Sequence, residues 1–81
     1  MEYEIWIAVE VSSVVDENDV TRAMRRAALL RRAGRPVVPA VAGERVDDRA
    51  REAPGIARVL VLEDGGAHQW ESALAAALDS R

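Results

Sequence analysis

Residues 7–43 read IAVEVSSVVDENDVTRAMRRAALLRRAGRPVVPAVAG, and this stretch decides the fold. Apolar residues alternate with others at its start, as in a β-strand, and the apolar run over residues 37–43 is typical of a strand covered on both faces. Acidic residues followed by arginines and alanines lie between them and indicate a helix that ends at Gly34. Strand, helix and strand in this order predict parallel strands joined by a right-handed crossover.

The first strand has two different faces. One face is apolar, and we expect it to lie in the core; it carries Tyr3, Ile5, Ile7, Val9 and Val11. The other face is mixed, and it carries Glu2, Glu4, Trp6, Ala8, Glu10 and Ser12. Trp6 is expected to pack against Trp70 across the sheet.

The first helix is predicted from Asp19 to Ala33, with Asp16 or Asn18 as its N-terminal cap. Its apolar residues recur at spacings of three and four, which predicts one buried stripe: Val20, Ala23, Met24, Ala27 and Leu30. A short, weak helix is expected over residues 44–55, a third strand over residues 56–64, and a last helix over residues 65–81. The buried stripe of that last helix is predicted to be Trp70, Ala73, Leu74, Ala77 and Leu78.

These elements predict a fold of the α/β class, in the order β-α-β-α-β-α and in two or three layers. Pro39 cannot donate a hydrogen bond in a sheet, so the second strand is expected at an edge. The predicted sheet is therefore three-stranded and mostly parallel, with strand order 2-1-3. Residues 1–81 are expected to form a single small domain.

Composition narrows the possible functions. The chain has 81 residues, no cysteine and one histidine, which excludes a disulfide framework or a thiolate metal site. A core this small gives only marginal stability, and we expect the chain to gain further stability by self-association as a homodimer. A net charge of −3 gives no support for nucleic acid or anionic lipid as a partner. With no apolar run of 18 residues and no basic leader, we expect no membrane partner and a cytoplasmic location.

Within residues 8–43 the chain resembles the C-terminal half of PD-(D/E)XK nuclease-like (restriction-endonuclease-like) proteins of bacteria and archaea. In that group a strand reading E-x-S precedes an acidic turn, an arginine- and alanine-rich helix, and a strand close to V-V-P-V-V-A-G. The most specific matching parts here are residues 19–23, DVTRA, and residues 37–43, VVPAVAG. The match continues more loosely through RVLVL in the third strand.

The resemblance implies a site in which carboxylates on adjoining strands hold Mg²⁺ and the metal activates water. Glu10 matches the acid of the family motif, and would be its metal ligand. Ser12 stands where the motif has lysine, so it supplies no positive charge. The aspartate that precedes them in the family has no counterpart in the nine residues before Glu10. We therefore expect catalysis to be absent, with Glu10 and Ser12 as the weak candidates if it is present.

Other polar groups have a functional and a structural interpretation. Arg22, Arg25 and Arg26 could contact phosphates of a nucleic acid, but a solvated helix face explains them better. Asp16, Glu17 and Asp19 are explained by helix capping rather than by a cation. Gly65 and Gly66 fit no phosphate-binding motif and are expected to turn the chain. His68 is expected on the surface, in the first turn of the last helix.

Three functions follow from these observations. The first is a non-catalytic, self-associating interaction module built on a nuclease-like fold, and the sequence favours it. The second is a Mg²⁺-dependent nuclease whose site is completed across a dimer, with Glu2 or Glu4 of another copy supplementing Glu10. The third is a small regulatory or ligand-binding domain, with the ligand at the carboxyl ends of the strands near Ser12, Ser13, Gly43 and Gly65.

Overall fold

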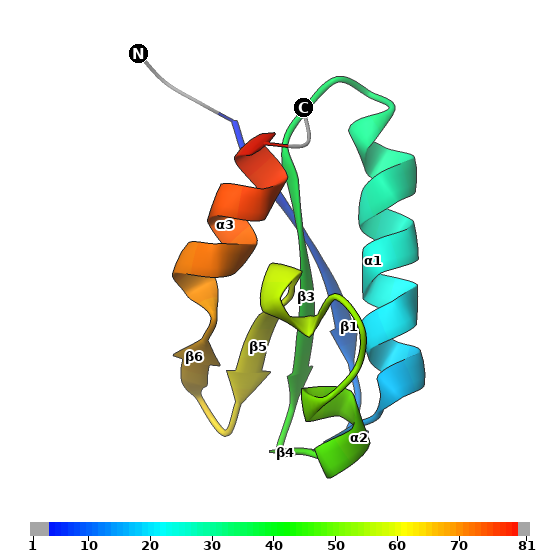
Figure 1. The fold of residues 1–81 in the computed structure, drawn as a ribbon, viewed down its shortest axis with the longest axis vertical. Coiled ribbons are helices and arrows are strands. Elements are labelled where there is room, and N and C mark those ends of the chain that lie inside the picture. Colours follow the sequence, from blue (N-terminus) through cyan, green and yellow to red (C-terminus); the bar gives the residue numbers. More distant parts are fainter. Residues whose placement is uncertain (1–3, 80–81) are drawn as a thin grey trace.

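The computed structural model describes residues 4–79, so the predictions for Glu2 and Tyr3 lie outside the described residues. A four-stranded sheet separates two helices, with α1 on one face and α3 on the other (Figure 1). The strands of this sheet are β1 (Trp6–Val11), β3 (Val37–Gly43), β5 (Leu60–Glu63) and β6 (Gly66–His68). The remaining elements are β2 (Val14–Val15), α1 (Glu17–Arg31), β4 (Arg45–Val46), α2 (Asp48–Arg51), the 3-10 turn η1 (Ile56–Arg58) and α3 (Trp70–Asp79). The α/β class is therefore confirmed.

The predicted strand order 2-1-3 is wrong. The order is β1-β3-β5-β6, which places the proline-bearing β3 in the interior of the sheet and β1 at an edge. Gly43 accepts a hydrogen bond from Asp64, so the polar groups of the odd-numbered residues of β3 point towards β5. Pairing with β5 begins only at Ala40, opposite Leu60. Pro39 thus lies just before that ladder, where its missing N–H removes no strand bond.

The sheet also has a fourth strand that the sequence analysis assigned to the last helix. β6 pairs with β5 in the antiparallel sense, with Leu62 opposite Ala67. Asp64 and Gly65 both have positive φ, at 46° and 82°, and form the two-residue turn between these strands. An Asp-Gly pair in this conformation is a strong hairpin signal. His68 is exposed as expected, but it lies in β6 rather than in a helix.

Helix α1 begins two residues earlier than predicted, at Glu17, because Asp16 is its cap. The Asp16 side chain accepts from the Asp19 N–H, and the Asp19 side chain accepts from the Asp16 N–H, which completes a capping box. Val20, Ala23 and Ala27 of the predicted stripe are fully buried. Within residues 4–79, no helix is both long enough and apolar enough to cross a membrane.

The core has one part on each side of the sheet. Val20 and Ala23 of α1 pack with Val41 and Val61 on one side. Ala73 and Ala77 of α3 pack with Val38, Ala40 and Leu60 on the other. Ile5, just before β1, packs against the α3 part of this core, whereas the carboxyl end of β1 lies away from α3 (Figure 1).

The apolar face of the first strand was expected in the core, and Ile5 is partly buried there, but this position of α3 overturns the expectation for the other described residues of that face. Ile7, Val9 and Val11 lie opposite Val38, Ala40 and Ala42, and thus on the α3 side. Because α3 covers β3 and β5, these three side chains remain 46, 43 and 76% exposed. Trp6, opposite Val37, belongs to the α1 side, so the predicted contact between Trp6 and Trp70 of α3 is also wrong.

Candidate functional site

The candidate site lies where the carboxyl end of β1 meets the first turns of α1. Glu10 lies opposite Val41 in the register and therefore projects to the α1 side of the sheet. Its Oε1 is 2.9 Å from Nε of Arg26, and the Glu10 side chain is only 16% exposed. The direction of approach gives an ion pair without a hydrogen bond, so this buried oxygen accepts none from the described residues. Glu10, the acid of the predicted motif, thus forms an ion pair with Arg26 of α1.

Ser12, two residues further along the same face of β1, reaches the N-terminal turn of α1. Its side chain is hydrogen-bonded to the carboxylate of Asp19. Arg22, one turn later on α1, forms an ion pair with the same carboxylate. The serine that replaces the motif lysine therefore binds a helix acid and takes no part in contacts to Glu10 that the structure records.

Asp19 is the most enclosed charged residue of this region, with its side chain 4% exposed. Burial alone would raise the pKa of Asp19, because a charged carboxylate loses its hydration. Hydrogen bonds from the Asp16 N–H, the Ser12 hydroxyl and the Arg22 guanidinium outweigh burial and hold that pKa below its usual value. Asp19 is therefore ionised at neutral pH and anchors this corner of the fold.

The structure brings together four of the five predicted site residues. Glu10, Ser12, Arg22 and Arg26 surround the junction of β1 and α1, whereas Arg25 is exposed and pairs with no described acid. The sequence analysis treated Asp19 only as a capping residue and missed its contacts to Ser12 and Arg22. The available signal was the spacing of Asp19 and Arg22, three residues apart on one helix face.

The chemistry of this junction is that of paired charges. Each carboxylate faces a guanidinium, so the two acids and two arginines compensate one another. Among residues 4–79, no three histidine or acidic side chains lie close enough together to hold a metal ion.

A second charged group lies at the carboxyl ends of β3 and β5. Glu63 accepts hydrogen bonds from Arg51 at 2.8 Å and from the Val46 N–H at 3.2 Å. The hydrogen bond from Arg51 is the main reason that the pKa of Glu63 lies below its usual value. This contact ties α2 to β5. Gly43 lies nearby against Ser12 and Ser13, with no room for a side chain.

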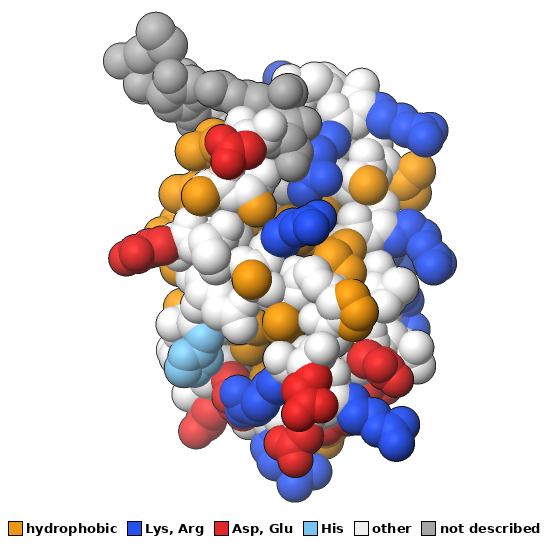
Figure 2. Space-filling view, viewed as in Figure 1, with side chains coloured by type: hydrophobic (Ala, Val, Ile, Leu, Met, Phe, Trp, Pro, Cys, Tyr) orange, Lys and Arg blue, Asp and Glu red, His pale blue; other side chains and the backbone are white. Residues whose placement is uncertain are grey.

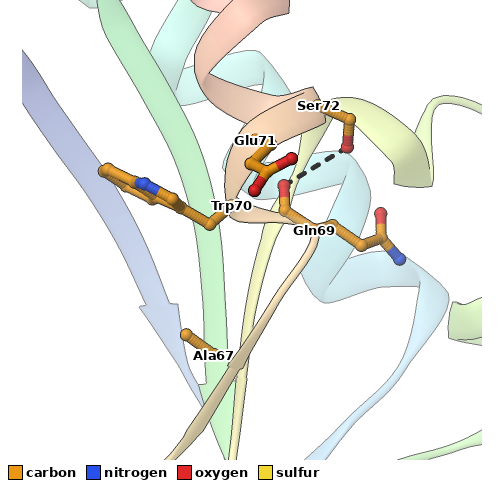
Figure 3. Close-up of a pocket in the computed structure, with 5 residues that line it drawn as sticks. All are labelled: Ala67, Gln69, Trp70, Glu71 and Ser72. Carbon is orange, nitrogen blue, oxygen red and sulfur yellow. Dashed lines mark hydrogen bonds between the residues drawn. The ribbon is translucent and has the colours of Figure 1, made fainter.

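A shallow depression surrounds the first turn of α3 (Figure 3). It is lined by Ala67, Gln69, Trp70, Glu71 and Ser72, and Ser72 Oγ donates to the Gln69 carbonyl at 3.3 Å. The Trp70 indole extends over β3 in the direction of β1, and it is 44% exposed (Figure 3). It adds an aromatic surface to the side of the sheet on which Ile7, Val9 and Val11 are bare.

Comparison of the chain with protein-family models, curated proteins and solved structures gives no match. The resemblance to PD-(D/E)XK nuclease-like proteins over residues 8–43 stays a prediction.

Proposed function

We propose that the protein is a non-catalytic interaction module on a nuclease-like scaffold, and that it associates with a second copy of itself through β1. The observation that carries this proposal is the state of that edge. Within the described residues β1 pairs with β3 alone, and Ile7, Val9 and Val11 remain 46, 43 and 76% exposed. An edge strand with exposed apolar side chains is a template for pairing with another chain.

The direction of the backbone N–H and C=O groups of β1 also supports pairing at this edge. Trp6 and Ser12 donate their N–H groups to Pro36 and Ala42, which shows that the even-numbered residues of β1 point their polar groups to β3. The N–H and C=O groups of Ile7, Val9 and Val11 therefore point away from the sheet, because ladder groups alternate along a strand. The residues with bare side chains are the residues with free backbone groups.

A two-fold axis at Val9 makes this edge self-complementary. In an antiparallel pair, Val9 then faces Val9 of the second copy, and Ile7 faces Val11. All of these cross-strand contacts join β-branched apolar side chains, which are favourable partners. Glu10 faces Ala8 of the second copy, so no like charges are opposed. Such pairing would join two four-stranded sheets into one.

Charge on the α1 side favours the same contact. Arg22 and Arg26 lie on the flank of α1 nearest β1, and both are already neutralised by Asp19 and Glu10. Leu30 follows Arg26 by four residues, lies on the same stripe of the helix, and is 38% exposed. The flank that would meet a second α1 thus carries an apolar side chain and no excess charge.

The test is the oligomeric state of the whole chain by analytical ultracentrifugation at micromolar concentration. We expect a dimer for the wild type and a monomer for Val9→Lys, because lysine on an edge strand opposes pairing. Ala75→Lys, which adds the same charge at an exposed position of α3, should leave the dimer intact. A monomeric wild type would contradict the proposal. A dimer in Val9→Lys would show that the chain associates through a surface other than β1.

A magnesium titration separates this proposal from the alternative of a nuclease completed across a dimer. In the register above, Glu4 of the second copy would lie opposite position 14, roughly 13 Å along the strand from Glu10. The two acids could not share an ion. We expect no Mg²⁺ or Mn²⁺ binding by calorimetry in the wild type, and binding that is lost in Glu10→Ala would favour the nuclease.

A further inference from the structure

A small cavity lies on the opposite side of the fold from the β1 edge. It is lined by residues of four elements, and its volume is about 180 Å³. The lining residues are Met24 and Arg31 of α1, Pro39 of β3, Arg58 of η1 and Ala76 of α3. Two arginines and three apolar residues surround it, and no acidic residue is among them.

Arg31, which lines this cavity, has an unpaired hydrogen-bond donor. Its Nε is buried and has no hydrogen-bond partner in the described part of the chain. One Nη donates to the Val37 carbonyl over a long 3.4 Å. A buried donor without a partner is costly, because it has lost its hydration without compensation. The carbonyls of the last turn of α1 do not supply the partner, since they accept from Arg32, Ala33 and Gly34.

Arg58 brings a second positive charge to the same cavity. It forms no ion pair with any acid in residues 4–79, unlike Arg22, Arg26, Arg35 and Arg51. An arginine cannot lose its proton at neutral pH, so both charges persist. Figure 2 shows arginine side chains in the middle of this face, between α3 and α1. Among residues 4–79, neither of the two arginines that line this cavity has an acidic partner, so a bound anion would compensate both charges.

We propose that this cavity binds a small phosphorylated molecule, with the phosphate between Arg31 and Arg58. A phosphate group carries about −1.5 to −2 charges at pH 7, which matches two guanidinium groups, and arginine binds its oxygens in a bidentate manner. The volume is about six times that of a water molecule in the liquid, so it holds a phosphate and a short substituent. Met24, Pro39 and Ala76 would contact that substituent. This proposal is independent of association through β1.

The experiment is a titration of the whole chain with inorganic phosphate, glycerol phosphate and acetate, followed by NMR at the Met24 methyl group and by calorimetry. We expect saturable binding of both phosphates, tighter for glycerol phosphate, and weaker binding of acetate. Arg58→Gln and Arg31→Gln should each weaken phosphate binding about tenfold, since each removes a charge-assisted contact. Arg49→Gln, an exposed arginine of α2, should not change it.

Arg58 is exposed and forms no described ion pair, so Arg58→Gln can be tested without loss of the fold even if Arg31→Gln unfolds. The proposal is overturned if phosphate leaves the Met24 signal unchanged, or if acetate binds as tightly as phosphate. It is equally overturned if Arg49→Gln weakens binding as much as Arg58→Gln, because the attraction would then be general.

Discussion

Glu10 Oε1 lies 2.9 Å from Arg26 Nε, and this ion pair connects the edge strand β1 to the middle of α1. The two partners differ in environment: the Glu10 side chain is 16% exposed and that of Arg26 is 67% exposed. In a metal-dependent nuclease a carboxylate at this position would face a cation from solution. Here a cation of the same chain already occupies that side of the carboxylate, which supports a structural role for Glu10.

Arg26→Ala should therefore destabilise the fold by about 1 kcal/mol, because it leaves the buried Oε1 of Glu10 without a counter-charge. The exposure of Arg26 keeps the effect this small. Urea unfolding measures it, and Arg25→Ala, on the same helix but without an ion pair, is the control. If Glu10→Gln cancels the loss in a double mutant, the two side chains are coupled. Equal effects of Arg26→Ala and Arg25→Ala would contradict this account.

Asp19 predicts how stability depends on pH. Its pKa is lower in the folded state than in the unfolded chain, so its contribution to stability is complete above the unfolded value of about 3.9. It is lost as the pH falls through the lower, folded value. The difference in unfolding free energy between wild type and Asp19→Asn should thus be largest at neutral pH and shrink in acid. Glu17→Gln, at an exposed position of the same turn, should change the unfolding free energy much less. If the difference between wild type and Asp19→Asn is the same at every pH, the stability does not depend on ionisation of Asp19.

Gly43 should tolerate no side chain. A Cβ at this position would collide with the carbonyl oxygen of Ser12 and lie 3.0 Å from Val15. The Ser12 carbonyl belongs to the backbone that leaves β1, so relief of this collision would require movement of the backbone. We expect Gly43→Ala to cost about 2 kcal/mol or more in thermal or urea unfolding. Gly66→Ala is the matched control, because its nearest neighbour is at 3.4 Å, an ordinary contact.

The sequence was sufficient to predict the elements that depend on local periodicity and capping. The stripe of Val20, Ala23 and Ala27 and the cap at Asp16 both appear in α1. It was insufficient where the position of an element depends on its neighbours in the folded structure. Pro39 indicated an edge strand, but its missing N–H falls just before the point where β5 begins to pair. Asp64-Gly65 carried a hairpin signal that was read only as a turn.

In the candidate site, too, the sequence predicted the local features and not the tertiary contacts. The alternation of β1 placed Glu10 and Ser12 on one face, as the structure has them. Nothing in that pattern could reveal that Arg26 and Asp19 would be their partners, because those contacts depend on how α1 crosses the strand. Alternation also could not tell which face of β1 would be covered. That depends on where α3 lies, and α3 leaves Ile7, Val9 and Val11 bare.

Hydrogen exchange along β1 tests the register proposed for the dimer, one residue at a time. The amides of Ala8, Glu10 and Ser12 point to β3, so they should be protected at every protein concentration. The amides of Ile7, Val9 and Val11 point to the open edge, and only a second β1 would protect them. We expect their exchange to slow in a concentration-dependent manner in the wild type and to remain fast in Val9→Lys. A dimer in which these three amides still exchange freely would associate through another surface, because antiparallel pairing centred on Val9 gives each of them a carbonyl partner.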